Sequence, residues 1–158
     1  MEAMTTSEDL RAIADRYWEA RLEASPLFAT FLGDHRYDDR VDDLSEQGEA
    51  RQRQTWLGFL AEAEAVDPDE LDATDRVTRQ LLVEEIGDAV SSIDARLIEL
   101  TSDQMQGIHA ELLTMAGQLR ASEPEHAAMA VKRVRAMGSM LDQAVERYRA
   151  GLAAGRTP

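Results

Sequence analysis

The chain of 158 residues is long enough for one domain with a hydrophobic core, and no apolar stretch approaches the roughly 20 residues that span a bilayer. Its 31 acidic and 17 basic residues give a net charge of −14, which disfavours binding to nucleic acid or to an anionic membrane surface. Cysteine is absent and residues 1–10 lack the apolar core of a secretory signal, so we expect a cytoplasmic protein without disulfides or thiolate metal sites.

The first third of the chain predicts two helices followed by an acidic loop. Thr6 and Asp9 resemble a capping box, and apolar residues then recur every three or four positions, which predicts a helix over 7–24. Pro26 opens a short apolar helix that ends before Gly33, a residue type common at helix C-termini. Residues 34–44 (DHRYDDRVDDL) follow neither helical nor strand periodicity, which predicts an ordered or semi-ordered loop.

Helical periodicity dominates the rest of the sequence. It predicts helices over 45–66, 74–100, 110–120 and 123–153, with a break over 101–109. The last helix is expected to turn one apolar stripe inward, formed by Ala127, Val131, Val134, Met137, Leu141, Val145, Tyr148 and Leu152. No segment predicts a strand, and no linker divides the chain. The predicted fold class is all-α: a single domain over 1–158 built as a bundle of about five to six helices, with long antiparallel helices, a short helix and an ordered acidic loop.

The acidic loop is expected to pack against the bundle despite its five Asp residues. Arg36 and Arg40 can pair with its carboxylates, while Tyr37 and Val41 can serve as apolar anchors. The loop lacks the Asp and Gly spacing of a calcium-binding loop. We therefore expect a loop held by arginine pairs rather than by a cation.

The sequence contains no complete catalytic or metal-binding motif. A three-histidine zinc site would need His35, His109 and His126, which come from a loop, a junction and a helix start. Glu123 and His126 have the spacing of half a di-iron site, but the second Glu-x-x-His is missing, and a carboxylate in a first helical turn is stabilising by itself. Phosphate loops, G-x-S-x-G and H-E-x-x-H motifs do not occur. We expect no catalytic residue, no metal ligand and no cofactor within this chain, and no peptidase, esterase or nuclease activity from it.

The order of residues from 14 to 45 resembles the opening of a bacterial family, the domain-of-unknown-function 885 family. The shared features are the Tyr17-Trp18 pair, Ser25-Pro26, an aromatic-Ala turn, and Gly-Asp-His-Arg-Tyr-Asp-Asp over 33–39. Asp-Arg-Val over 75–77 resembles the start of a later family helix, and Gln-Met-x-Gly-x-His over 104–109 resembles a family junction. The segment 141–156 resembles the last helix before the family's catalytic portion.

Members of this family look like helical zinc metallopeptidases, and the resemblance implies zinc only for longer members, whose His-Glu helix follows the part present here. It implies that this chain is a non-catalytic N-terminal helical domain, or a shortened relative, that forms one wall of a cleft for a peptide-like substrate. Its partner would be a C-terminal catalytic portion. The candidate cleft residues carried over by the resemblance are Asp34, His35, Arg36, Tyr37, Gln104, Gly107 and His109.

A function of a different class stays open at this point: a free-standing helical module that binds another helix or its own copy. The surface expected to do so is aromatic and comprises Trp18, Phe28, Phe31 and Trp56. A reading frame that continues past Pro158 would favour the cleft wall, and a stop codon there would favour the module. A ligand- or metal-binding bundle would need a buried polar constellation that the sequence does not indicate.

Overall fold

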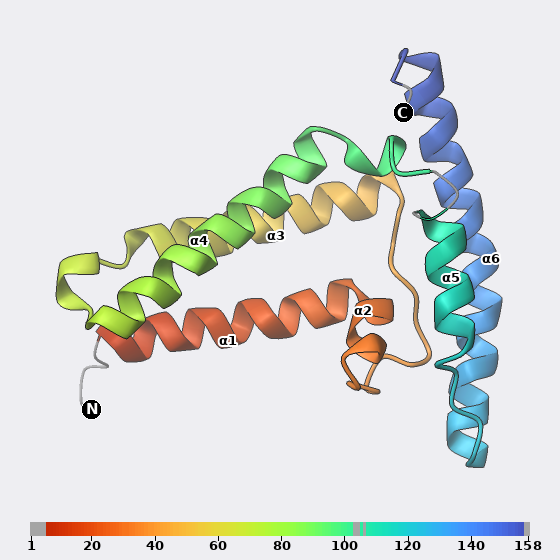
Figure 1. Cartoon of the computed structure of the whole chain (residues 1–158), viewed down its shortest axis with the longest axis horizontal. Helices are drawn as coiled ribbons and strands as arrows, with labels where there is room; N and C mark the ends of the chain where they lie inside the picture. Colours follow the sequence, from red (N-terminus) through yellow and green to blue (C-terminus); the bar gives the residue numbers. More distant parts are fainter. Residues whose placement is uncertain (1–5, 103–104, 106, 157–158) are drawn as a thin grey trace. The chain divides into compact units, whose positions relative to one another are not determined.

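The computed structural model describes residues 6–102, 105 and 107–156. Within these residues the chain forms helices and no strand, which confirms the all-α prediction (Figure 1). No described helix is long and apolar enough to cross a membrane. The α-helices are α1 (Thr6–Ala24), α2 (Pro26–Phe31), α3 (Glu46–Ala65), α4 (Ala73–Asp94), α5 (Ile108–Ala116) and α6 (Pro124–Ala153), and the single 3-10 turns are η1 (Pro68–Glu70) and η2 (Leu97–Glu99).

The chain divides into two compact units, which are described separately. Unit 1 comprises residues 1–21 and 50–95, and unit 2 comprises 22–49 and 96–158. Unit 1 therefore holds most of α1 and α3 together with α4, and unit 2 holds α2, the acidic loop, η2, α5 and α6. The single domain expected over 1–158 stays a prediction.

Unit 1 is a three-helix core with aromatic residues at its centre. The Tyr17 ring meets the rings of Trp56 and Phe59 edge-on, with centroids 5.3 and 5.9 Å apart. Ile86 of α4 is fully buried. Asp72 caps α4 by accepting from two backbone N–H groups of its first turn, as expected for an aspartate at this position.

The prediction of an exposed aromatic docking surface is wrong in part. Trp56 is only 4% exposed, because it fills the core of unit 1 beside Tyr17. Trp18 and Phe31 are exposed, and Phe28 is half-buried. The four side chains therefore do not form one exposed patch.

The helix predicted over 74–100 ends early, at Asp94. Arg96 has the left-handed backbone conformation, with φ of 53°, and this breaks the helix before η2. The Arg96 guanidinium contacts the carboxylates of Glu46 and Glu99, each at 3.1 Å. These ion pairs stabilise the turn at Arg96, which the spacing of apolar residues could not predict.

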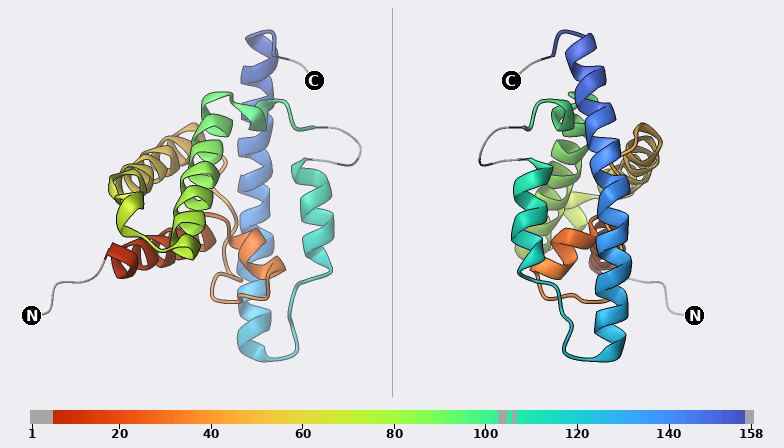
Figure 2. Two further views of the ribbon diagram at one scale, coloured as in Figure 1. Left: turned by 60° about the vertical axis from the view of Figure 1, so that its left-hand side comes forward. Right: turned by 90° about the vertical axis from the view of Figure 1, so that its right-hand side faces the viewer.

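Unit 2 is built around α6, with α5 lying alongside it (Figure 2). Its hydrophobic core joins α2, α5 and α6 through Leu27, Ile108, Met115, Met140 and Ala144. Val41 and Leu44 of the acidic loop pack against this core. α5 begins at Ile108, two residues earlier than predicted, so His109 belongs to the helix rather than to the break.

The face of α6 that turns inward differs from the predicted one. The buried residues are Arg133, Met140, Ala144, Arg147 and Gly151, whereas five residues of the predicted stripe are exposed: Val131, Val134, Leu141, Val145 and Leu152. The prediction of the inward face is wrong because it considers only apolar residues. Two arginines and a glycine lie on the buried face, and hydrophobic periodicity does not identify polar or small residues as part of a core.

Candidate functional site

Arg133 of α6 organises the acidic loop from beneath. Its side chain is 1% exposed, and its guanidinium lies 3.6 Å from the Asp38 carboxylate. It donates to one hydroxyl and three backbone carbonyls: Thr30 Oγ1 at 2.7 Å, and the carbonyl oxygens of Tyr37 at 2.7 Å, Arg40 at 2.8 Å and Pro26 at 3.3 Å. A planar guanidinium has five N–H donors, and this geometry uses them to fix α2 and the loop together.

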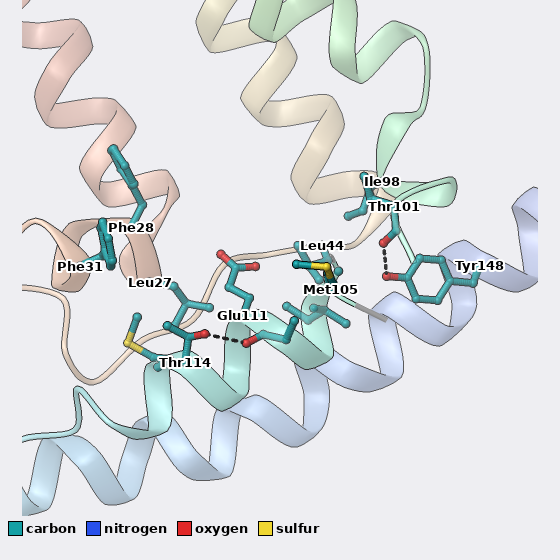
Figure 3. A pocket seen from close by; sticks show the side chains of 14 residues that line it. Leu27, Phe28, Phe31, Leu44, Ile98, Thr101, Met105, Glu111, Thr114 and Tyr148 are labelled. Carbon is teal, nitrogen blue, oxygen red and sulfur yellow. Dashed lines mark hydrogen bonds between the residues drawn. The ribbon is translucent and has the colours of Figure 1, made fainter. Parts of the chain in front are cut away.

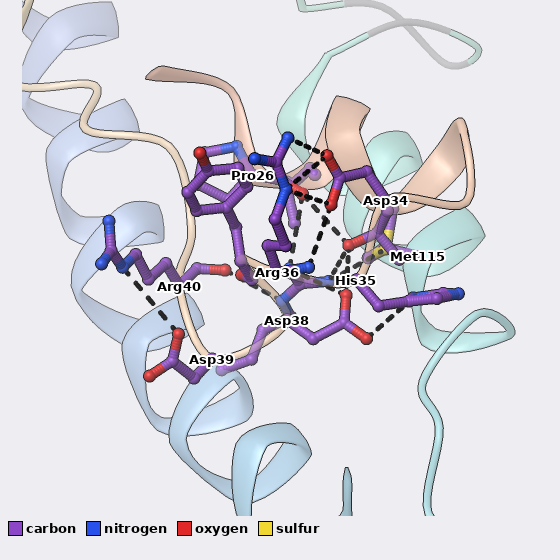
Figure 4. Close-up of polar contacts among 12 residues, drawn as sticks. Pro26, Asp34, His35, Arg36, Asp38, Asp39, Arg40 and Met115 are labelled. Carbon is purple, nitrogen blue, oxygen red and sulfur yellow. Dashed lines mark hydrogen bonds and ion pairs between the residues drawn. The ribbon is translucent and has the colours of Figure 1, made fainter. Parts of the chain in front are cut away.

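The outer side of the loop is held by arginine pairs, as expected (Figure 4). Arg36 bonds Asp34 at 2.6 Å, and this hydrogen bond holds the pKa of the Asp34 carboxyl below its usual value. The guanidinium groups of Arg36 and Arg40 lie 5.4 and 5.5 Å from the centre of the Tyr37 ring. His35 Nδ1 lies 3.0 Å from the Asp38 carboxylate. The loop is therefore packed on both sides rather than a solvated connection.

An open apolar pocket of about 530 Å³ lies in unit 2 (Figure 3). Leu27, Ile108 and Met115 are its buried part, while Phe31 and Met105 are exposed on its rim. The remaining lining residues are Phe28, Leu44, Ile98, Thr101, Gly107, Ala110, Glu111, Thr114 and Tyr148. Tyr148 donates its hydroxyl to the Thr101 carbonyl, and Thr114 donates to the Ala110 carbonyl, so these polar side chains are already paired.

Glu111 is the one charged residue among those that line the pocket. It has no hydrogen bond or ion pair with another described residue, and the apolar lining partly desolvates its carboxyl, which raises its pKa. Nearby Asp42 accepts the Leu27 backbone N–H at 3.2 Å. Burial raises the pKa of Asp42 to about 6, and the charge of Glu111 adds to this shift. The pocket thus combines apolar walls with a carboxylate that has no counter-charge.

A second charged cluster in unit 2 is held by ion pairs between buried groups. The Glu99 side chain is completely buried and faces the guanidinium groups of Arg96, Arg147 and Arg156. Burial opposes ionisation, but hydrogen bonds from Arg156 and Arg96 outweigh it and hold the pKa of Glu99 below its ordinary value. Arg147 also lies 2.6 Å from Glu49. These ion pairs join η2 to α6 and to the start of α3, which is a structural role.

The structure separates the candidate cleft residues. Asp34, His35, Arg36 and Tyr37 belong to the acidic loop and do not line the pocket.

Gly107 does line the pocket. It is the residue immediately before α5, and its backbone has a positive φ of 116°. A side chain there would place Cβ 2.8 Å from the Thr101 carbonyl oxygen, so glycine is required at this position. His109 is exposed on α5, outside the pocket lining, and Gln104 lies outside the described residues.

Sequence reasoning missed Arg133, Glu111 and Asp42. Each is a charged residue in a helix or loop, which in a single sequence looks like an ordinary solvent-exposed side chain. The one available signal was the position of Arg133 beside, rather than opposite, the apolar stripe of the last helix.

The described residues do not fit a zinc site. Within them, no three His, Asp or Glu side chains are grouped so that they could hold a metal ion. We accordingly assign no step to a metal in this chain.

Comparisons with known proteins identify the family of this chain and nothing further about it. Neither a curated protein nor a solved structure matches the chain. A family model described as a bacterial protein of unknown function (DUF885) matches residues 26–158, which include the acidic loop, the pocket and all of α6. The resemblance noted in the residue order is thereby confirmed, and the chain belongs to the DUF885 family.

Proposed function

We propose that this chain is the non-catalytic helical domain, or a shortened relative, of a cytoplasmic metallopeptidase-like hydrolase, and that it forms one wall of the substrate cleft. The chain belongs to the DUF885 family. The hydrolase part of the proposal rests on the zinc-metallopeptidase character that the sequence resemblance implies for longer members of this family. The observation that carries the cleft part is the open apolar pocket with its unpaired Glu111. In this proposal a catalytic portion supplies the zinc and the reaction, and this chain contributes binding.

The pocket chemistry points to an apolar group that carries a positive charge. Its walls favour aliphatic or aromatic carbon, since each buried CH₂ contributes roughly 0.8 kcal/mol. A carboxylate with raised pKa and no counter-charge gains most from an ammonium group placed beside it. The amino terminus of a peptide whose first side chain is apolar combines both groups within one residue. Such a peptide is the ligand class that we assign to the pocket.

The test is a binding titration of the purified chain, followed by NMR, with leucyl-leucine amide and its N-acetylated form. We expect both to shift resonances of the pocket residues, and we expect the free amine to bind about fivefold more tightly, the gain of one partly exposed ion pair. Glu111→Gln should abolish that difference. Thr114→Trp should fill the pocket and abolish binding of both peptides.

Glu125→Gln is the matched control, because Glu125 also lies in the first turn of a helix but does not line the pocket. It should leave both affinities unchanged. Absence of binding, or binding that persists in Thr114→Trp, would refute the pocket as a substrate contact.

The alternative function, a free-standing interaction or dimerisation module, is favoured by a different observation. It is the exposed apolar stripe of α6, which lies on another face of that helix than the buried one.

A further inference from the structure

The exposed stripe of α6 has the spacing of a helix-pairing seam. Its large apolar residues are between 40% and 67% exposed: Val131, Val134, Leu141, Val145 and Leu152. With Gly138 and Tyr148 they alternate at steps of three and four over three heptads, which is the a and d pattern of a two-helix coiled coil. Tyr148 also packs against the core of unit 2, but the five exposed residues of the stripe lie outside both the buried face and that core.

The centre of the stripe permits close helix approach. Gly138 is exposed, and a Cβ built on it would meet no atom within 4 Å. A glycine at the centre of an apolar seam lets a second helix approach and accept a large side chain. In an antiparallel pair with its centre between residues 139 and 140, each Gly138 faces Leu141 of the partner subunit.

Two charged residues beside the stripe indicate that its partner is a second copy of this chain. Arg135 and Asp142 flank it on the same side, both are exposed, and neither pairs with another described residue. They are one heptad apart, about 10.5 Å along the helix, so they do not pair within one chain. In the antiparallel register each Arg135 lies beside Asp142 of the partner subunit, which forms the pair twice. A parallel pair would leave both charges without an opposite charge in reach.

We propose that α6 is a homodimer interface in which two copies of this chain pair antiparallel along the stripe from Val131 to Leu152. The apolar residues supply the buried surface, and the reciprocal Arg135–Asp142 pairs fix direction and register. Of the stripe, only Tyr148 lines the pocket, and the five exposed apolar residues do not, so the inference does not rest on the pocket's ligand.

Sedimentation equilibrium of the full chain tests the interface. We expect a dimer that Leu141→Glu converts to a monomer, because the substitution places a charge at the centre of the seam. Leu81→Glu is the matched control, since Leu81 is equally apolar and 60% exposed on α4 of unit 1, and it should leave the dimer intact. Circular dichroism of both variants should remain helical.

Charge exchange tests the register. Arg135→Glu and Asp142→Arg should each raise the dimer dissociation constant about tenfold, and the double variant should restore it. A module docked by apolar contact alone would show no such rescue.

Spin labels test the direction, because the chain has no cysteine and one introduced cysteine is unique. A label at Ser139→Cys should lie close to its copy, whereas labels at Ala128→Cys should be about 35 Å apart along an antiparallel pair. A monomer at every concentration, a dimer that survives Leu141→Glu, or short distances at both labels would overturn the proposal.

Discussion

Replacing Arg133 of α6 by methionine should destabilise unit 2 more than any single substitution within the acidic loop. Methionine retains much of the aliphatic length but removes every N–H donor. The Arg40 carbonyl would lose its side-chain donor, and the carbonyls of Pro26 and Tyr37 would keep only the Thr30 hydroxyl and the Arg40 backbone N–H, respectively. The Asp38 carboxylate would lose its nearest buried cation.

The magnitude follows from these contacts. Removing one partner of a buried ion pair costs about 3–5 kcal/mol, and each buried polar group left unpaired costs about 1–3 kcal/mol. Asp38 and the loop carbonyls are partly exposed, so water can replace some of the lost bonds. We therefore expect a loss of about 4 kcal/mol. Arg133→Lys should lose about 2 kcal/mol, because one ammonium cannot reach acceptors spread around a planar fork.

Urea unfolding followed by circular dichroism measures the loss, and hydrogen exchange of the amides of 34–43 locates it. Arg149→Met is the control, since Arg149 is exposed on the same helix and pairs with no described residue; it should change the free energy of unfolding by no more than about 0.5 kcal/mol. If Arg133→Met stayed within about 1 kcal/mol of the native chain and the loop amides stayed protected, the assignment of Arg133 as the organiser of the loop would be wrong.

Three further changes test other parts of the structure. The pKa of Asp42 is about 6 in the folded chain and roughly 3.9 in an unfolded chain, so the fold loses stability as the pH rises through this interval. Asp42→Asn should therefore raise the free energy of unfolding by about 1–2 kcal/mol at neutral pH and change it little near about pH 4, as measured by urea unfolding at both pH values. Tyr37→Ala should cost about 2 kcal/mol through lost packing between two guanidinium groups, whereas His35→Ala, which loses one contact to Asp38, should cost less than about 1 kcal/mol; equal costs in thermal melts would contradict this. Gly151→Ala should destabilise by about 1–3 kcal/mol, because its Cβ would lie 2.9 Å from the Cβ of buried Glu99, while Gly58→Ala, with open space around it, should stabilise by about 0.5–1 kcal/mol.

The sequence alone was sufficient for the helical class, for most helix positions and for the family. Period 3.6 in the apolar residues predicts helices wherever it persists, and Pro26, Pro68 and Pro124 mark their boundaries locally. The family was visible in the order of residues 33–39, since a specific run of seven residue types is informative without any geometry. The packing of the acidic loop could also be expected, because its arginines lie beside its aspartates in the chain.

Tertiary structure decided which surfaces meet. Periodicity shows that α6 has an apolar stripe, but it does not show that Arg133 and Arg147 would occupy the interior while Val131 and Leu141 stay exposed. A buried arginine is stable only where acceptors from distant segments converge on it, and no local pattern records that convergence. The end of α4 at Asp94 and the unpaired Glu111 in the pocket have the same origin. Each depends on an environment formed by residues distant in the sequence, which only the folded chain brings within contact distance.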